Sequence, residues 1–302
     1  MSRNIINIDT LNDENKARLK VLTSPPALSK PTAIMCVVLV SVYLTVYVTG
    51  FAGILPLWLG MLINAVVGYL AFSVAHDSIH RSISSDSILN DRIGQLGVAI
   101  VLPYVNLKLF RWAHILHHRF ANGERDPDLF FNGAWWTLPF RWMLIEFAYM
   151  RYAIKHGDKI SAPALSSSLR RAAVFFTFLG ILIYAGYGYE VLMLWFIPTR
   201  LQQLMLGFTF FWLPHVPHDV TQAEHYTKAT TIRRGYETVL SPLMQYQNYH
   251  LIHHLFPMTP FYNNKKVYDL IETELEKYEL AVQHGLSIKP VIKPGLVATN
   301  IK

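Results

Sequence analysis

The sequence contains little charge and almost no cysteine. Charged residues make up 16% of the 302 residues and apolar residues 52%, whereas soluble domains usually carry about 25% charged residues. Cys36 is the only cysteine, which excludes disulfides, cysteine-ligated zinc and an internal iron–sulfur cluster. The composition therefore indicates a membrane protein, in which any metal must be bound through nitrogen and oxygen.

Lysine and arginine are absent from residues 31–80 and 172–199, although the formal net charge is +7. Four apolar runs overlap these two stretches, at 32–55, 57–75, 172–187 and 191–213. A spanning helix needs about 20 apolar residues, and the nearly uncharged turns within each pair are typical of the non-cytoplasmic side. We predict an all-helical integral membrane protein with four spans in two hairpins and a cytoplasmic helical cap.

We expect a single domain over residues 1–302, with an N-terminal arm (1–30), a catalytic membrane domain (31–285) and a C-terminal tail (286–302). The arm is polar where a cleaved signal peptide would need an apolar core. We therefore expect both termini to lie in the cytoplasm, in a multi-pass protein of the cytoplasmic membrane. An apolar piece at 93–105 is too short to span and predicts an interfacial or re-entrant helix. Residues 264–283 predict a charged amphipathic helix.

Ten of the thirteen histidines lie in four clusters. The spacing i, i+3, i+4 occurs twice, and a shorter cluster has the spacing i, i+4. The members are His76 and His80; His114, His117 and His118; His215 and His218; and His250, His253 and His254. On a helix these spacings place the imidazoles on one face, where they can converge on one metal centre.

The number of clustered histidines suits two metal ions better than one. Imidazole binds iron, copper and zinc alike, but a single hydrolytic zinc needs about three protein ligands and would leave most of the histidines unexplained. Metal-bound imidazoles usually donate their other ring nitrogen to a carboxylate or carbonyl. Candidate acids near the clusters are Asp77, Asp126, Asp128, Asp219 and Glu224.

Three of these clusters, at residues 76–80, 114–118 and 250–254, are histidine boxes. In this order and with this hydropathy pattern, they resemble the membrane fatty acid desaturase superfamily of non-haem di-iron enzymes. The resemblance covers about residues 30–280. Residues 247–257 and 260–263, together with Leu213-Pro214-His215 and Asp126-Pro127-Asp128, are similar to the cyanobacterial-type beta-carotene hydroxylase branch. The bacterial membrane decarboxylases that make terminal alkenes from fatty acids are similar in the same regions.

The resemblance implies two iron ions, O2 as co-substrate and a long hydrophobic lipid as substrate. It implies nine iron ligands: His76, His80, His114, His117, His118, His215, His250, His253 and His254. Asn248 would make a water-mediated contact, and His218, at a position where the hydroxylases carry no histidine, is a possible ligand. Because the chain lacks a cysteine cluster and a dinucleotide fingerprint, we expect a ferredoxin-type electron donor with its reductase. We expect no nucleic-acid partner.

Arg200, Gln202 and Gln203 interrupt the fourth apolar run. They indicate either a kink facing a wet cavity or the polar lining of a substrate tunnel. The leading hypothesis is hydroxylation of a carotenoid-type lipid. Alternatives are a fatty-acyl desaturase, a terminal-alkene-forming fatty acid decarboxylase, a zinc-dependent membrane hydrolase and a metal-binding transporter.

Overall fold

The structure, a computed structural model, describes residues 6–296 and is mostly helical, as predicted. The remaining residues of the predicted arm and tail lie outside the described part. Backbone contacts divide the chain into two units. Unit 1 comprises Met1–Pro26, Ile115–Asn132 and Phe208–Lys302, and unit 2 comprises Ala27–His114 and Gly133–Gly207. The single domain expected from the sequence stays a prediction.

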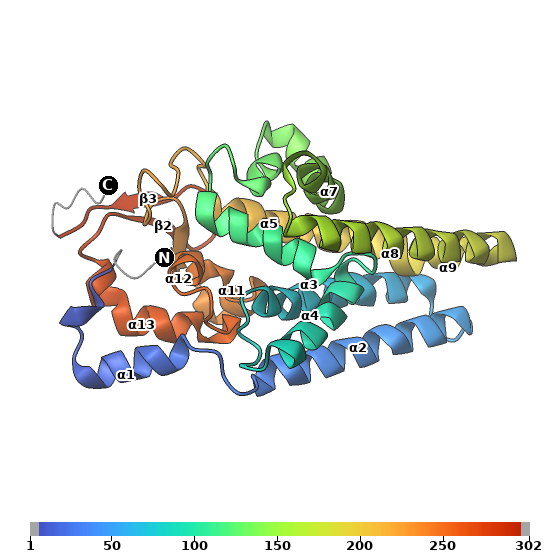
Figure 1. Ribbon diagram of the computed structural model, residues 1–302, viewed down its shortest axis with the longest axis horizontal. Coiled ribbons are helices and arrows are strands. Elements are labelled where there is room, and N and C mark those ends of the chain that lie inside the picture. Colours follow the sequence, from blue (N-terminus) through green and yellow to red (C-terminus); the bar gives the residue numbers. More distant parts are fainter. Residues whose placement is uncertain (1–5, 297–302) are drawn as a thin grey trace. The chain divides into compact units, whose positions relative to one another are not determined.

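Unit 2 begins with two long helices, α2 (Lys30–Phe51) and α3 (Leu57–Ile79), which run in opposite directions (Figure 1). Pro31 stands in the first turn of α2, where its missing N–H costs nothing. At a rise of 1.5 Å per residue the helices are about 33–35 Å long, enough to cross a hydrocarbon core of about 30 Å. Both coincide with apolar runs predicted from the sequence.

Helix α4 (Ser87–Val101) packs closely on α3. A Cβ atom at Gly97 would lie only 2.9 Å from the backbone nitrogen of Ala75, so only glycine permits this approach. The predicted short helix is therefore present, but it begins before residue 93 and ends before residue 105. The next helix, α5 (Leu107–Phe120), contributes residues 107–114 to unit 2 and residues 115–120 to unit 1.

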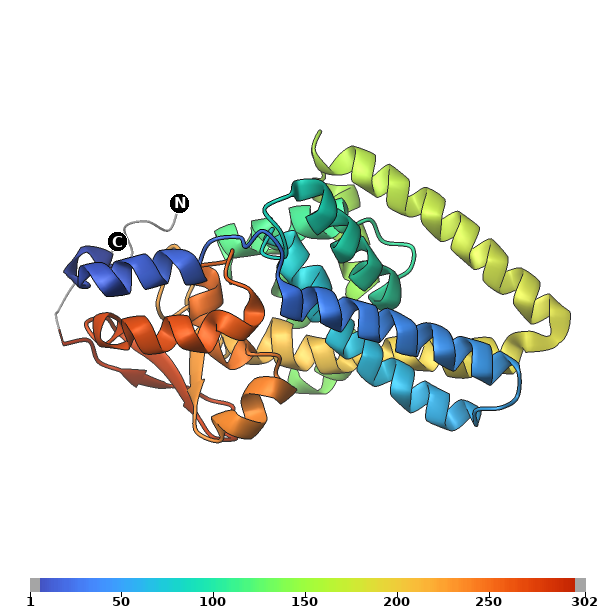
Figure 2. The ribbon, with the colours of Figure 1, turned by 90° about the horizontal axis from the view of Figure 1, so that it is seen from below.

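The rest of unit 2 contains α6 (Leu138–Trp142), α7 (Ile145–His156), α8 (Ser161–Leu182), α9 (Gly188–Val191) and α10 (Ile197–Leu206). After α8 the chain turns back at Gly186, whose φ of +98° is a conformation that glycine tolerates (Figure 2). The described residues contain three stretches long and apolar enough to cross a membrane: Lys30–Phe51, Leu57–Ile79 and Ser161–His215, the last with 55 residues. The number of four spans stays a prediction.

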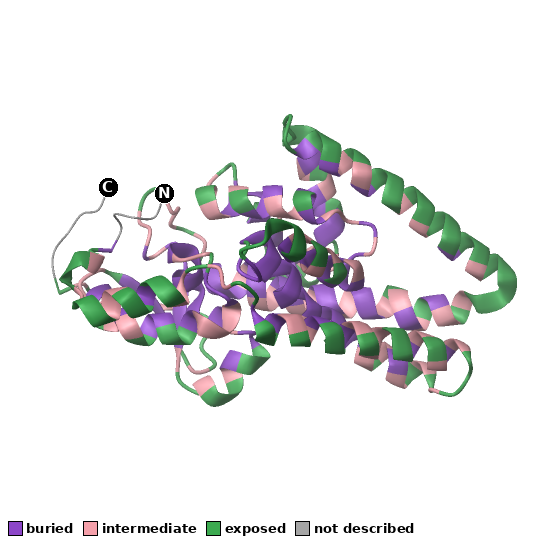
Figure 3. Ribbon diagram, turned by 60° about the horizontal axis from the view of Figure 1, so that its bottom comes forward, coloured by how far each residue is buried: buried purple, intermediate pink, exposed green. Residues whose placement is uncertain are grey.

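Much of the outward side of these long helices is exposed (Figure 3), and many of the exposed residues are large and apolar. Val37 on α2 is 66% exposed, and Val174 and Phe178 on α8 are 72% and 53% exposed. Soluble monomers rarely expose contiguous apolar surface of this kind. The helices instead suit contact with lipid, and the chain is a membrane protein.

The carbonyl of Leu194 illustrates how unit 2 satisfies polar groups between these helices. It lies in a π-helical segment, Leu192–Phe196, where the regular α-helical hydrogen-bond pattern is interrupted. It accepts hydrogen bonds from Asn64 Nδ2 at 2.8 Å and from the Tyr47 hydroxyl at 3.1 Å. Such partners are needed where water is excluded.

Unit 1 contains a three-stranded sheet that the sequence analysis did not predict. The strands are β1 (Thr231–Arg234), β2 (Leu280–His284) and β3 (Val291–Lys293), in the order β1-β2-β3. β1 and β2 are parallel, with Thr231 opposite Ala281, and β3 is antiparallel to β2. The helix predicted over 264–283 ends at Leu275 as α13 (Asn264–Leu275), because residues 280–282 are buried in the sheet.

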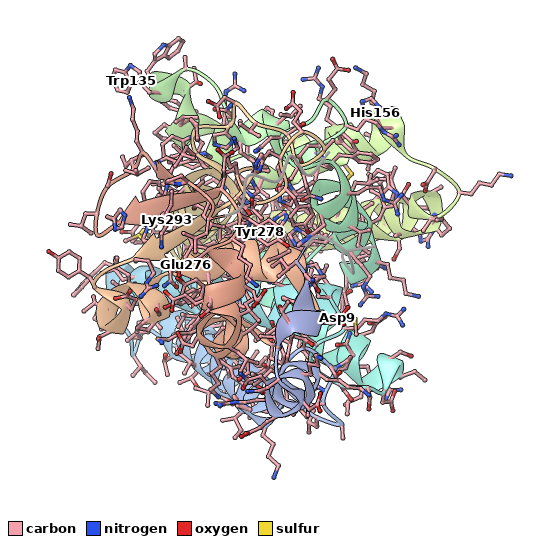
Figure 4. All side chains as sticks on the ribbon, turned by 90° about the vertical axis from the view of Figure 1, so that its left-hand side faces the viewer. Asp9, Trp135, His156, Glu276, Tyr278 and Lys293 are labelled. Carbon is pink, nitrogen blue, oxygen red and sulfur yellow. The ribbon has the colours of Figure 1, made fainter. Side chains whose placement is uncertain are left out.

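The hydrophobic core of unit 1 lies among this sheet and the helices α1 (Asp13–Leu22), α12 (His250–Leu255) and α13. Leu251, Ile252 and Leu255 of α12 are almost completely buried in it. Lys293 of β3 donates to Glu276 Oε1 at 2.5 Å, just beyond α13 (Figure 4). The remaining short helices of the described residues, in both units, are Ile8–Thr10, Pro127–Phe131, Trp135–Thr137, Ile183–Tyr187, Gly207–Trp212, Leu213–His215, α11 (Glu237–Leu243), Gln247–Tyr249 and Phe261–Asn263.

Candidate metal centre

Three histidines form a buried triangle in unit 2. His76 and His80 lie at the C-terminal end of α3, and His114 lies on α5. Their ring centroids are 4.8–5.0 Å apart in every pair, and the Nε2 atoms of His76 and His114 are separated by 3.1 Å. The side chains predicted from the i, i+4 spacing and from the second box therefore meet.

Four histidines gather in unit 1: His117, His215, His250 and His254, all buried. One ring nitrogen of each lies within 4.8 Å of the corresponding nitrogen of all the others. The Nε2 atom of His250 is 3.0 Å from that of His215 and 3.2 Å from that of His254. This group combines members of two boxes with His215, the predicted ninth ligand.

Two carboxylates hold the other ring nitrogen of His117. Its Nδ1 lies 3.0 Å from Asp126 Oδ1 and 3.3 Å from Asp128 Oδ2, and all three side chains are buried. Burial by itself lowers the pKa of His117, but the charges of Asp126 and Asp128 and the hydrogen bond to Asp126 outweigh it and raise the pKa to about 9. Asp126 is fixed in turn by the backbone N–H groups of Asn122 and Asp128, each at 2.8 Å.

Glutamines play the same part for two other members of the group. The Nδ1 atom of His250 lies 2.6 Å from Gln247 Oε1, and that of His254 lies 3.2 Å from Gln222 Oε1. Because an amide oxygen only accepts, both histidines carry their proton on Nδ1 and turn the Nε2 lone pair inward. The side chain of Gln222 is held by its own donation to the carbonyl of His118 at 2.8 Å.

This donor set fits a metal ion bound by nitrogen. Neighbouring nitrogen ligands at about 2.1 Å from one ion in octahedral geometry are about 3.0 Å apart, close to the Nε2 separations in the group. Buried inward-facing lone pairs at such distances repel one another unless a cation lies between them. Hydrogen-bonded outer nitrogens are the usual companions of metal-bound imidazoles.

The boxes divide their members, in contrast to the simplest prediction that each box converges on one centre. His118 and His253 pair with each other in unit 1, with their Nε2 atoms 2.9 Å apart. The ring of His118 also stacks on His254 at 4.2 Å. Residues at i, i+3 and i+4 share one helical face but differ in direction and height along it, so neighbours in sequence can serve different groups.

His218 lies beside the four-histidine group without being a member of it. Its ring centroid is 6.2 Å from those of His215 and Trp212, and its backbone has a φ of +67°. Burial lowers its pKa to about 4. At neutral pH the ring is therefore uncharged, and its role as a ligand stays a prediction.

The remaining candidate partners have other neighbours. Asp77 accepts a hydrogen bond from the Thr32 hydroxyl at 3.1 Å, and Asn248 Nδ2 donates to Ser241 Oγ at 3.1 Å. Asp219 is exposed. Asp126 and Asp128 are predicted acids that lie against a clustered histidine, His117.

Unit 2 also contains a narrow apolar cavity of about 40 Å³. Its wall includes Phe72 and Ala75 of α3, Phe110 and Ala113 of α5, and Gln203 of α10. Ala75 directly precedes His76 and Ala113 directly precedes His114. The cavity therefore adjoins the segments that carry the three-histidine triangle.

The three polar residues of the fourth apolar run are placed differently from one another. Gln203 lines the cavity, whereas Arg200 is paired with the cavity residue Glu146. Gln202 Nε2 donates to the carbonyl of Val101 at 2.6 Å, and its amide oxygen packs against Gly68. Gln202 thus ties the end of α4 to α3 and α10.

A model of the fatty acid desaturase family matches residues 20–285. The chain belongs to the fatty acid desaturase family. This desaturase-family protein is 28% identical over 194 residues to a beta-carotene ketolase of Paracoccus sp. (strain PC1), covering 63% of this chain and 70% of the ketolase. It is 26% identical over 264 residues to a chloroplastic omega-6 fatty acid desaturase of Glycine max, covering 74% and 58% of the two chains. A dihydrorhizobitoxine desaturase of Bradyrhizobium elkanii is 29% identical over 217 residues, which cover 63% of this chain and 60% of that desaturase.

Membership of this family makes the protein an oxidoreductase with histidine clusters suited to metal, acting on lipid in a membrane. Three contributors to its sites were not found from the sequence: Gln222, Gln247 and Glu146. Gln247 stands three residues before His250, and this spacing was a usable signal. Gln222 and Glu146 are brought to their partners by tertiary folding, so local sequence gave no sign of them.

Proposed function

We propose that the protein is an O2-dependent di-iron enzyme that oxidises a C–H bond of a long hydrophobic lipid, most simply by hydroxylating a carotenoid-type substrate. The observation that carries this proposal is the four-histidine group of unit 1. Its ring nitrogens converge, while Asp126, Asp128 and two glutamines hold the outer nitrogens of His117, His250 and His254. The proposed iron ligands are the nine histidines of the predicted set.

The irons would supply the activation of O2 and the removal of hydrogen from an unactivated carbon. The protein's own residues orient the ligands and the substrate. Asp126 and Gln247 keep the proton of His117 and His250 on Nδ1, so that Nε2 is available as a ligand. We place the reacting part of the lipid against the apolar cavity wall of unit 2, next to the segments that carry His76 and His114.

The choice of a carotenoid rests on the similarity to beta-carotene ketolases. The similarity to an omega-6 desaturase, which covers 74% of this chain, favours a second candidate, desaturation of a fatty-acyl chain. Terminal-alkene formation from a fatty acid is a third outcome of the same chemistry, because removal of hydrogen precedes all three products.

We further propose four spans in the cytoplasmic membrane, with both termini and the histidine clusters on the cytoplasmic side. The reversal at Gly186 would divide Ser161–His215 into the third and fourth spans. Electrons would come from a ferredoxin-type carrier and its reductase. The lone cysteine, Cys36, is buried, and a single thiol does not assemble an iron–sulfur cluster.

The experiment is metal analysis of the purified protein with Mössbauer spectroscopy on iron-57-enriched material, followed by product analysis with beta-carotene or fatty acids, ferredoxin and its reductase. We expect about two irons per chain in a nitrogen-rich environment, and oxygenated carotenoid. One zinc with negligible iron, from iron-replete cells, would instead favour the hydrolase. Alkenes or unsaturated acids with untouched carotene would select the fatty-acyl alternatives.

A further inference from the structure

A buried polar network borders the apolar cavity of unit 2. Glu146 of α7 and Gln203 of α10 both line the cavity, and both side chains are almost inaccessible to solvent. Glu146 accepts hydrogen bonds from the Arg200 guanidinium and from Gln203 Nε2, the latter at 2.6 Å. Arg200 also donates to the carbonyl of Met143 at 2.5 Å. The ion pair leaves no net charge, which suits an apolar setting.

This network fixes the orientation of the Gln203 amide. A carboxylate only accepts hydrogen bonds, so the amide nitrogen must face Glu146 and the amide oxygen must face away from it. Among the described residues the Oε1 atom of Gln203 has no hydrogen-bond partner, and the residue has no exposed surface. A buried acceptor without a partner costs about 1–3 kcal/mol. The geometry therefore calls for a donor that comes from a bound molecule.

The cavity links this acceptor to the histidines of the same unit. Phe72 and Phe110, whose rings are 5.6 Å apart, line the cavity together with Gln203. The Phe72 ring stacks on His76 at 5.9 Å, and the Phe110 ring lies 6.4 Å from that of His114. A group that enters the cavity would thus lie against the aromatic wall of the histidine triangle and beside the side chain of Gln203.

We propose that Gln203 determines substrate specificity by accepting a hydrogen bond from a hydroxyl group of the lipid, with Glu146 and Arg200 as positioning residues. The proposal rests on the proposed function, because it takes the cavity to be the substrate site. It names the substrate class as an apolar lipid that carries a hydroxyl group, such as a hydroxylated carotenoid or a long-chain alcohol. A pure hydrocarbon leaves the amide oxygen unsatisfied.

The test measures binding in lipid nanodiscs, in air and without an electron donor, so that no turnover occurs. Two pairs of probes differ by one hydroxyl: beta-carotene with its monohydroxy derivative, and hexadecane with 1-hexadecanol. We expect the wild-type protein to bind the hydroxylated member of at least one pair about 10- to 100-fold more tightly. The Gln203→Met variant, which keeps the length of the side chain without the amide, should bind both members about equally. The responding pair distinguishes a carotenoid from an alkyl substrate.

Matched controls separate recognition from general damage. Leu204→Met changes an apolar side chain of the same helix that does not line the cavity, alters no polar group, and should keep the wild-type ratio of affinities. Because each pair is compared in both proteins, differences in membrane partition cancel. Glu146→Gln frees the amide to rotate and should reduce the ratio in part.

Two results would overturn the proposal: equal affinity for both members of each pair in the wild type, or an unchanged preference in Gln203→Met with normal iron content. If a water molecule satisfies the Gln203 amide oxygen, the wild type would bind both members of each pair with equal affinity. Preference for the hydroxyl without any oxidation after addition of ferredoxin and its reductase would leave the recognition intact and count against the proposed function.

Discussion

The two units secure their histidines by different means. In unit 2, the triangle of His76, His80 and His114 stands on α3 and α5, and α3 is held in turn by close packing against α4 at Gly97. In unit 1, His250 and His254 stand on a six-residue helix whose other side is inserted in a hydrophobic core. Ligand geometry can thus come from rigid spans or from a small core reinforced by hydrogen bonds.

The largest effect is expected from removing one histidine from the triangle of unit 2 or from the four-histidine group of unit 1. His80→Ala and His254→Ala should both abolish lipid oxidation, and each should lower the iron content from about two to about one per chain. The exposed His156, which lies outside every cluster (Figure 4), provides the control, and His156→Ala should retain full iron and activity. Elemental analysis and product analysis check this. Full iron content with undiminished oxidation in either cluster variant would refute the ligand assignment for that cluster.

The second-largest effect is expected from removing core volume beneath α12. Ile252→Ala removes a side chain with no exposed surface from the core of unit 1, and we expect the free energy of unfolding to fall by about 2–5 kcal/mol. Because Ile252 lies between His250 and His253, iron content should fall as well. Denaturant unfolding with parallel iron analysis measures both. An unchanged iron content in a destabilised variant would show that the histidines do not depend on this core.

The metal-free protein should lose stability as the pH rises. The pKa of His117 is raised from 6.5 to about 9, so its contribution is fully present below pH 6.5 and disappears as the pH passes through about 9. The expected loss is about 3 kcal/mol. Thermal unfolding of chelator-treated protein between pH 6.5 and 9.5 tests this, and Asp126→Asn should flatten the profile. A rise in stability over that range would be inconsistent with the pairing.

Asp126→Asn should weaken metal binding without removing a ligand. Replacing the partner of a metal-bound imidazole typically costs about 10- to 100-fold in affinity, because the ring is less well oriented and less basic. Competition with a chelator of known affinity measures the change. Asp219→Asn is the control, since Asp219 is exposed. Equal affinities of the two variants would mean that the carboxylate does not support the ligand.

The smallest effect is expected on the outside of unit 2. Val174 on α8 is 72% exposed, so Val174→Ala should change stability in nanodiscs by less than about 0.5 kcal/mol. Thermal unfolding of the Val174→Ala variant, measured alongside the Ile252→Ala variant, provides the comparison. A loss above about 1 kcal/mol would indicate that Val174 packs against protein instead of lipid.

The features predictable from sequence are those with a local pattern. The apolar runs gave α2 and α3, and the histidine spacing gave the candidate side chains but not how they are divided between the two groups. Asp126 was found because it follows the second box closely. The sheet was missed because its strands have three to five residues, too few to show a period. Gln222 was missed because it meets His254 across 32 residues of chain.

In unit 2, the histidine triangle and the polar network around Gln203 lie on different pairs of helices. The triangle comes from α3 and α5, whereas the acceptor network comes from α7 and α10. Under the role proposed for Gln203, substitutions in α7 and α10 would alter which lipid is bound without removing a histidine of the triangle. Proteins built in this way can change substrate while keeping the same chemistry. Changes of the substrate preference of this protein would therefore begin in α7 and α10.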